Sequence, residues 1–216
     1  GIDIDIMNNV VYWTDGGGII KKGTIGDTGF STASDFINDG ADTPRKMGGI
    51  ALDVSGGKIY WASTYDLSIK SADLFDPDPI STVQTIVSGL NYPIGIAVDP
   101  GGKIYYTDND ISGTDDLSAT LHQMNFDGSG DVVLSTSPIG INEYVYRDVK
   151  LDIDNNMVYW SGGNNNIFSA SGEIYYADIS DVSGTVMSFN TFNNSPWGID
   201  LDLTNNKIYW TDIVTY

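Results

Sequence analysis

The chain contains no cysteine, one histidine and two glutamates. Without cysteine it can form neither a disulfide nor a thiolate zinc site, and it has no thiol nucleophile. No apolar run approaches the roughly 18 residues that a membrane-spanning helix needs. The sequence begins at Gly1 with neither an initiator methionine nor a signal peptide, and we interpret it as a piece of a processed or longer polypeptide.

Basic residues are also scarce. Ten lysines and arginines face 29 acidic residues, which gives a net charge of −19. Such a field repels nucleic acids and anionic membrane surfaces, so we expect neither as a partner and no membrane insertion. The acidity serves solubility or, alternatively, forms an acidic recognition surface. Because the acid is almost all aspartate, the composition is typical of a protein rich in turns.

A phrase of about eleven residues occurs five times. Residues 202–212 read DLTNNKIYWTD, and related phrases follow Asp5, Asp53, Asp99 and Asp152. A Gly-Ile pair precedes the aspartate in four copies, whereas the fourth has Asp148-Val149. Repeats with a period of about 50 residues indicate a stacked or radial repeat architecture.

Each copy predicts a β-hairpin. Short β-rich runs such as Gly95–Asp99 and Lys103–Thr107 flank a pair of Asn or Gly residues, which tolerate the positive φ of tight hairpins. The second run is apolar on both faces, because Ile208 and Trp210 point one way and Tyr209 points the other. We therefore expect these strands to lie between two packed layers.

The intervals between copies have room for two further strands. We predict Ser68–Leu74 and Thr82–Val87 in the second copy, Ala119–Phe126 and Asp131–Ser135 in the third, and Glu173–Ile179 and Thr185–Phe192 in the fourth. Four antiparallel strands per repeat, with no long helical period, predict an all-β fold, a β-propeller. We expect residues 1–216 to form one domain whose blades begin near residues 1, 49, 95, 148 and 198.

These motifs resemble the YWTD β-propeller family of the low-density lipoprotein receptor. Tyr12-Trp13-Thr14-Asp15 and Tyr209-Trp210-Thr211-Asp212 are intact YWTD motifs, and the others are variants. The repeat residues that we expect to be structural are Tyr12, Trp13, Asp15, Tyr60, Trp61, Tyr105, Tyr106, Asp108, Tyr159, Trp160, Tyr209, Trp210 and Asp212. The second and fourth copies end in Ser63 and Gly162, so hydrogen bonds of the terminal aspartate must be replaced or absent there.

The resemblance implies six blades, but the chain holds four repeats and the first hairpin of a fifth. Three explanations stay open: an incomplete sequence, a five-bladed ring closed in an unusual way, or an open arc that another chain completes. Exposed sheet edges are normally covered, which favours the first and the last.

Catalytic and metal-binding signals are weak. His122 is the one histidine and has no sequence partner that indicates catalysis, so we predict a surface residue. The segment Asp127–Asp131 resembles part of a calcium loop but lacks its bidentate glutamate, and it fits better as a turn. Asp76, Asp78, Asp115 and Asp116 are expected as solvated loop charge. We predict no cofactor and no metal, although structural calcium held by other aspartates stays open.

Unrepeated residues are better candidates for function than the scaffold. The residues just before each opening strand should line one mouth of the propeller channel, and they are Met47, Tyr92, Ile94, Tyr146, Arg147 and Trp197. Aromatic residues and arginine are typical of interaction hot spots. The alternative is that Trp197 caps the channel as part of the core. A glycosylation sequon at Asn193 hints at secretion, and a glycan there would crowd Trp197.

Three functions are consistent with these observations. The first is a non-enzymatic extracellular module that binds a protein or peptide, as the resemblance implies. The second is a structural subunit of an extracellular assembly, a filament or coat made of copies of itself. The third is a metal-dependent hydrolase similar to gluconolactonase-type propellers, but Glu143 and Glu173 lie outside the positions expected for an axial metal.

Overall fold

Five antiparallel sheets follow one another along the chain in this computed structural model, which describes residues 1–26, 29–30, 33–38, 47–111, 118–137, 144–164, 171–190 and 195–213. The first two sheets consist of β1 (Ile2–Asp5), β2 (Val10–Thr14), β3 (Ile19–Gly26), β4 (Gly29–Phe30) and β5 (Ser34–Asn38), and of β6 (Met47–Asp53), β7 (Lys58–Ser63), β8 (Ser68–Asp73) and β9 (Gln84–Ser88). The other three consist of β10 (Pro93–Asp99), β11 (Lys103–Asn109), β12 (Ala119–Asn125) and β13 (Val132–Thr136), of β14 (Tyr144–Asp152), β15 (Met157–Asn164), β16 (Gly172–Asp178) and β17 (Met187–Asn190), and of β18 (Ser195–Asp202) and β19 (Lys207–Ile213). The prediction of an all-β propeller is confirmed.

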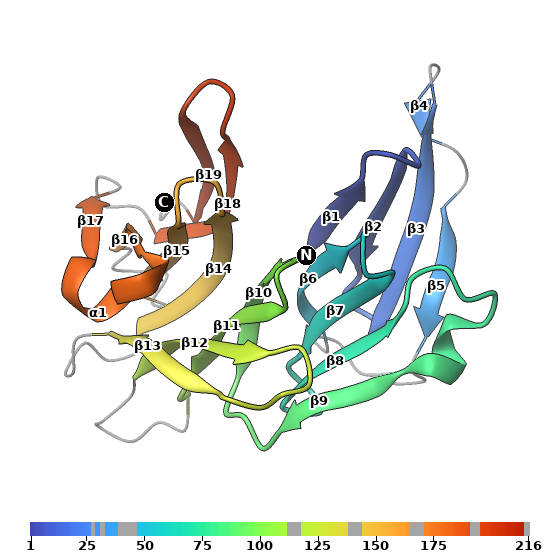
Figure 1. The fold of residues 1–216 in the computed structure, drawn as a ribbon, viewed down its shortest axis with the longest axis horizontal. Coiled ribbons are helices and arrows are strands. Elements are labelled where there is room, and N and C mark those ends of the chain that lie inside the picture. Colours follow the sequence, from blue (N-terminus) through green and yellow to red (C-terminus); the bar gives the residue numbers. More distant parts are fainter. Residues whose placement is uncertain are drawn as a thin grey trace.

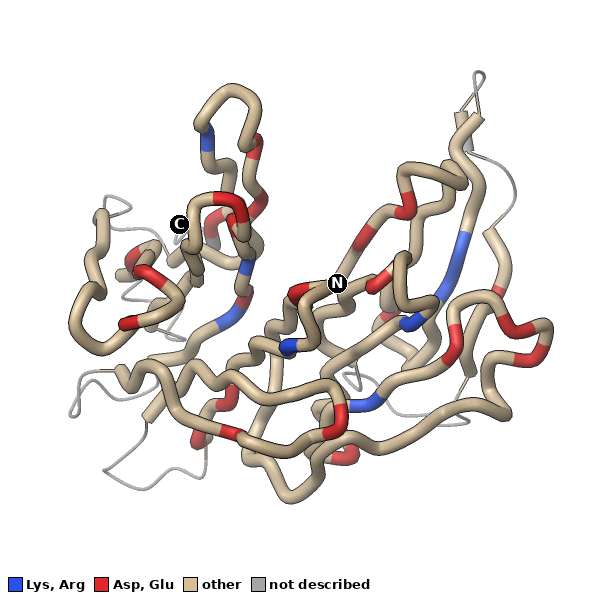
Figure 2. Tube along the Cα trace, viewed as in Figure 1, with Lys and Arg blue, Asp and Glu red and all other residues tan. Residues whose placement is uncertain are grey.

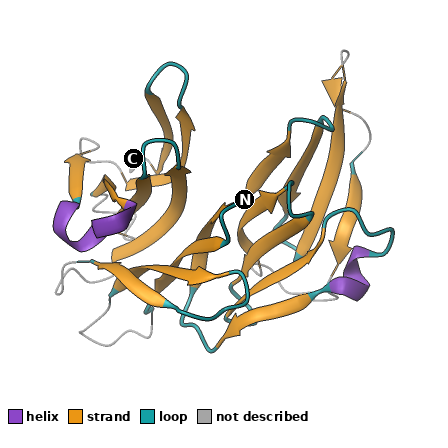
Figure 3. Cartoon of the chain, viewed as in Figure 1, coloured by secondary structure: helices purple, strands orange, loops and turns teal. Residues whose placement is uncertain are grey.

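Helical structure among the described residues is limited to the 3-10 turns η1 (Pro79–Thr82) and η2 (Ile179–Asp181) and to α1 (Val182–Thr185), as Figure 3 shows. No described helix has both the length and the apolar character that crossing a membrane requires.

The sheets are arranged as the blades of an open arc (Figure 1). The inner strands β1, β6, β10, β14 and β18 contact one another in this order, and the first and fifth sheets stand at the two ends. All inner strands run in the same direction. We call the side of the arc where they begin the start face, and the side where they end the end face.

The aromatic pairs pack the blades against one another. Tyr60 belongs to the apolar cluster between the second and third sheets, whereas Trp61 belongs to the cluster between the first and second. Tyr105 and Tyr106 divide in the same way around the third sheet. The first residue of each pair therefore faces the next blade and the second faces the preceding one, as alternation along a strand dictates. Burial of each large ring stabilises an interface by about 1.5–3 kcal/mol.

Each inner hairpin is closed by its strand-end aspartate. The carboxylates of Asp5 and Asp152 accept the backbone N–H three residues later at 3.1 and 3.2 Å, and side-chain amides at 2.7 and 2.8 Å. The predicted pair Asn8-Asn9 lies within the first connection, which spans residues 6–9. Only its last residue, Asn9, has a left-handed φ of 54°, and Gly57 takes the same place in the second blade. Asparagine and glycine are required here because they adopt this conformation at the least cost.

Candidate binding site on the start face

The inner hairpins of the second to fifth sheets share one irregularity. Strand pairing shifts between Met47 and Ile50, Pro93 and Ile96, Tyr146 and Val149, and Pro196 and Ile199. Each shift leaves two residues outside the ladder, and such β-bulges re-aim side chains near binding sites. The first bulged residues are Gly48, Ile94, Arg147 and Trp197, and we call them the bulge ring.

The second bulged residue is glycine in three blades, and in two of them the neighbouring inner strand approaches closely. A Cβ on Gly95 would lie 2.7 Å from the carbonyl oxygen of Arg147, and one on Gly49 would lie 3.1 Å from the nitrogen of Ile96. The fourth blade has Asp148 instead. Its carboxylate accepts the N–H of Val149 and that of Ile199 in the next inner strand, each at 2.9 Å.

A hydroxyl holds the bulge in three blades. Thr107, Ser161 and Thr211 accept the N–H of the second bulged residue at 2.8, 3.1 and 3.2 Å. The Ser161 hydroxyl also donates to the carbonyl of Trp197 at 2.6 Å, and that of Thr14 donates to Gly48 at 3.0 Å. The Thr or Ser of the repeated motif therefore couples one blade to the bulge of the next. Sequence reasoning missed this role, although the hydroxyl recurs in four of the five copies.

The terminal aspartate of the motif positions the segment that precedes β10. Asp108 accepts the N–H groups of Asn91 and Tyr92 at 3.0 and 2.7 Å. In the second blade Ser63 is hydrogen-bonded to Asp66 instead. In the fourth blade the glycine is needed for space, because a Cβ on Gly162 would lie 2.7 Å from the Tyr146 ring.

A buried amide that the sequence did not single out joins the third and fourth blades. The Asn109 side chain donates to the carbonyls of Tyr92 and Tyr146 at 3.2 and 3.0 Å, and it accepts the Tyr146 N–H at 2.7 Å. In the sequence, the one indication of a role for Asn109 is its position directly after Asp108.

Arg147 and Trp197 are brought together at the bulge ring. The Arg147 guanidinium lies 5.1 Å from the centre of the Trp197 ring and donates to the carbonyls of Pro196 and Asn164, both at 3.1 Å. Its side chain is buried, and desolvation lowers its pKa to about 10. Trp197 is 46% exposed. A fixed cation under an exposed indole restrains the ring and leaves its outer surface open.

The other predicted face residues differ in accessibility. Met47, Tyr92 and Ile94 are partly exposed. Tyr146 is buried in the cluster between the third and fourth sheets, edge-on to Trp160 at 6.1 Å, so it supports the face from below. The candidate surface is therefore Trp197 with Ile94, Tyr92 and Met47. Asn193, Glu143, Asp115 and Asp116 lie outside the described residues.

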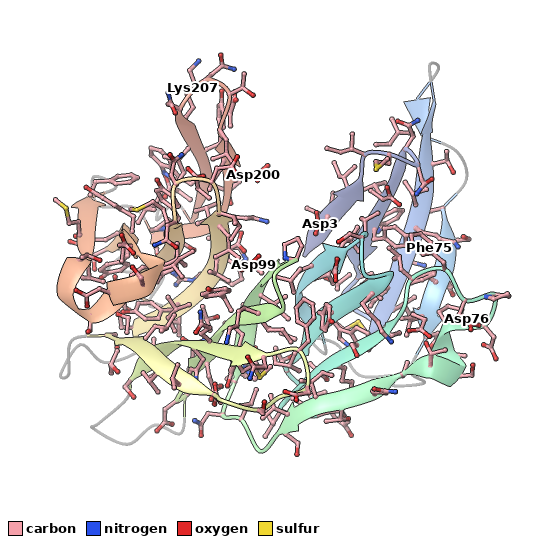
Figure 4. The ribbon with its side chains drawn as sticks, viewed as in Figure 1. Asp3, Phe75, Asp76, Asp99, Asp200 and Lys207 are labelled. Atoms are coloured by element: carbon pink, nitrogen blue, oxygen red, sulfur yellow. The ribbon has the colours of Figure 1, made fainter. Side chains whose placement is uncertain are left out.

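Charged side chains of the inner strands face the middle of the arc. Figure 4 shows Asp3 on β1 and Asp200 on β18 at its two ends. Asp3 accepts the N–H of Leu52 in the next inner strand at 2.8 Å. Burial raises the pKa of Asp3 and that of Asp148, against the opposing effect of nearby Lys150. Both carboxylates link neighbouring blades, and Lys150 acts on each of them.

His122 belongs to a contact group on the outer strands. Its ring stacks on Tyr106 with centroids 4.7 Å apart, and Nδ1 lies 3.2 Å from the Tyr106 hydroxyl and from Asp131. Burial raises the pKa of Tyr106, so its phenol stays protonated and is a poor nucleophile. Asp127 accepts the N–H of Ser129 at 2.9 Å within the turn predicted there. Within the described ranges, no three His, Cys, Asp or Glu side chains gather as a metal site would require.

No family model matches the chain. Among curated proteins it is 24% identical to Protein cueball of Drosophila willistoni over 164 residues, which is 74% of this chain, and 23% identical to that of Drosophila sechellia over 172 residues, which is 79%. The chain spans about a quarter of the length of these relatives, 23% and 24%.

Solved structures support the fold. A chain from a crystal structure of a nidogen/laminin complex matches 98% of this chain with a TM-score of 0.77, 20% identity and 71% coverage of that chain. Hydrazine synthase of Kuenenia stuttgartiensis and a luciferin-regenerating enzyme match at TM-scores of 0.64 and 0.63, with 13% and 14% identity and 59% and 67% coverage of their chains. The protein is thus a β-propeller that resembles the YWTD type, in its repeats as in its fold.

Proposed function

We propose that this chain is a non-enzymatic, extracellular protein-binding module of a larger protein, and that it binds its partner on the start face through Trp197. The observation that carries the proposal is the exposed indole, 46% accessible, held over the buried Arg147 guanidinium at 5.1 Å. Large aromatic side chains that are restrained before binding lose little conformational entropy on association and dominate many interfaces.

Two further observations support a protein partner. The chain carries a net charge of −19, which favours a partner with a basic surface through complementary electrostatics. Figure 2 shows acidic residues along the whole arc, with few basic ones between them. One similar structure is a nidogen/laminin complex, whereas others are named as enzymes. Because one fold hosts many functions, the proposal depends on the site and not on this likeness.

The experiment places a photo-crosslinking amino acid at Ile94, another residue of the candidate surface, and leaves Trp197 intact. We expect it to capture a discrete partner from an extracellular fluid, and we expect excess wild-type protein, but not Trp197→Ala, to compete. The matched control carries the same label at Ile153, an exposed residue in the β14–β15 turn on the end face. Equal capture from both positions would contradict a start-face site.

A second candidate function is a structural subunit that assembles with copies of itself. Tyr209 and Trp210 of β19 are 55% and 40% exposed, whereas their counterparts Tyr60 and Trp61 are buried. In the described part of the chain, β19 pairs with β18 alone.

A further inference from the structure

In the second, third and fourth sheets, the residue that directly follows the third strand packs over the preceding blade. Leu74, Phe126 and Ile179 each donate a backbone hydrogen bond to the last residue of their own inner turn, at 2.8, 3.2 and 2.8 Å, so they are structurally equivalent. Phe126 stacks on Tyr60 of the preceding sheet with centroids 5.0 Å apart and an interplanar angle of 29°. The equivalent residue over Tyr12 is the smaller Leu74.

The turn that follows also differs between these two interfaces. After Phe126 the chain closes tightly on the second sheet, since a Cβ on Gly128 would lie 2.5 Å from the carbonyl oxygen of Ile86. After Leu74 the sequence is Phe75-Asp76-Pro77-Asp78-Pro79, and η1 packs against β5. Proline has no N–H and a fixed φ, so this segment forms a firm wall without backbone donors at two positions.

A groove of about 470 Å³ lies between the first and second blades. It lies on the end face, opposite the bulge ring. Buried Tyr12 and Leu74 and the 59% exposed Phe75 are among its lining residues, and most of its accessible lining is polar and includes carboxylates. The residues that line it are Asp5, Asn8, Val10, Tyr12, Lys22, Asp35, Phe36, Leu74, Phe75, Asp76, Pro77 and Pro79.

The charges of the groove favour a cationic occupant. Asp35 and Asp76 are on the rim, and the Asp35 carboxylate pairs with half-buried Lys21 at 2.7 Å, a kind of surface pair worth about 0–1 kcal/mol. The one lining cation, Lys22, is directed over the Phe36 ring at 4.8 Å. Asp5 is already satisfied by Asn8. Figure 4 shows Phe75 and Asp76 together beside the first sheet.

We propose that this end-face groove binds an extended peptide segment that presents a lysine or arginine beside an aromatic or aliphatic side chain. The apolar side chain packs against the exposed ring of Phe75. The basic side chain reaches Asp35 and Asp76. The volume is within the range of roughly 300–1,000 Å³ for binding pockets, which suits a few side chains and not a folded domain. This surface is separate from the start-face site proposed above.

The test measures fluorescence anisotropy of a labelled nonapeptide, Gly-Arg-Phe-Lys-Leu-Arg-Phe-Lys-Gly, with the complete 216-residue chain. A comparison peptide has glutamate at every basic position. We expect the basic peptide to bind at least about tenfold more tightly and to weaken as salt rises. Equal binding of the two peptides, or no binding of the basic one, overturns the proposal.

Three variants locate the binding. Leu74→Phe introduces the residue of the next interface and fills the groove, Phe75→Ala removes an exposed wall, and Asp76→Asn removes rim charge. We expect the first two to weaken binding at least about tenfold and the third to reduce its salt dependence. Because Phe75 is exposed, its variant stays folded even if Leu74→Phe does not.

The matched control is the pair Ile153→Ala and Asp154→Asn. It removes an exposed apolar group and an exposed carboxylate from the end face of the fourth blade, away from the groove. We expect it to bind as the wild type does, and so should Trp197→Ala. If the control weakens binding as much as the groove variants do, the peptide binds by charge alone and the groove is not its site.

Discussion

Asp148 occupies a position where the other four inner strands have glycine. The carboxylate replaces the close backbone approach of the glycine blades with two hydrogen bonds, to Val149 and to Ile199 of the next blade. Burial is the largest influence on this group and raises its pKa above the ordinary 3.8. The folded protein therefore binds this proton more tightly than the unfolded chain does, which links the blade contact to pH.

Asp148 makes the stability of the fold depend on pH. Because its pKa is raised in the folded protein, its contribution to stability is complete below 3.8, the pKa in the unfolded chain, and is lost as the pH rises through the pKa in the folded protein. We expect Asp148→Asn, which keeps one acceptor and no charge, to gain stability relative to wild type as the pH is raised from 4 to 7. Urea unfolding of both proteins at each pH measures this difference. The pKa of Asp3 is raised in the same direction, but Asp3 is present in both proteins, so its effect cancels in the comparison. A difference that does not change with pH would refute the linkage.

At the scale of single elements, the coupling of a hairpin to the next blade depends on one hydroxyl. Ser161 is fully buried, accepts the Asp148 N–H and donates to the Trp197 carbonyl. The second blade has Ala62 at this position and no hydroxyl, so the contact is not obligatory everywhere. In the fourth blade the Ser161 hydroxyl holds the backbone of Trp197, whose indole is exposed.

We expect Ser161→Ala to lower the free energy of unfolding by about 1 kcal/mol, because it removes the partner of the part-buried Asp148 N–H and Trp197 carbonyl. Hydrogen exchange of the Asp148 and Gly198 amides should accelerate more than that of β11. Ser161→Thr is the control, since threonine serves in the first, third and fifth blades. Retained protection in the alanine variant would show that another group holds the bulge.

At the scale of the whole molecule, Tyr209 of the fifth sheet is 55% exposed, whereas its counterpart Tyr60 is buried. If the protein assembles with copies of itself, Tyr209 is the residue that becomes buried, because Trp210 faces the fourth blade and meets Phe189 edge-on at 6.0 Å. We expect Tyr209→Ser to shift sedimentation toward the monomer across the micromolar range, while Trp197→Ser leaves it unchanged. A wild-type chain that stays monomeric throughout would eliminate the structural-subunit function.

Local features could be predicted from the sequence. The strand-end aspartates, the Asn or Gly of the turns and the apolar second strands depend on neighbours a few residues away, and the hairpins form as expected. The predicted Ala119–Phe126 strand, for example, is observed as Ala119–Asn125.

The site depends on contacts that no local pattern contains. Glycine is required at position 95 because Arg147 approaches it from another blade. The partners of Arg147 are carbonyls of Pro196 and Asn164, so an arginine expected on the surface is buried. The sequence does contain one indication of the groove, because alignment of the repeats places Leu74 opposite Phe126. The alignment alone does not show that this position covers a tyrosine of the preceding blade.

The groove has a consequence for how the molecule loses its structure. Each sheet gains much of its stability from the blades that it packs against, as in linear repeat proteins. Among the described sheets the first packs against the second, and the groove lies at that junction. A molecule bound in the groove would therefore stabilise the contact between the first and second blades. Ligand binding at the groove and the stability of the first blade would be coupled.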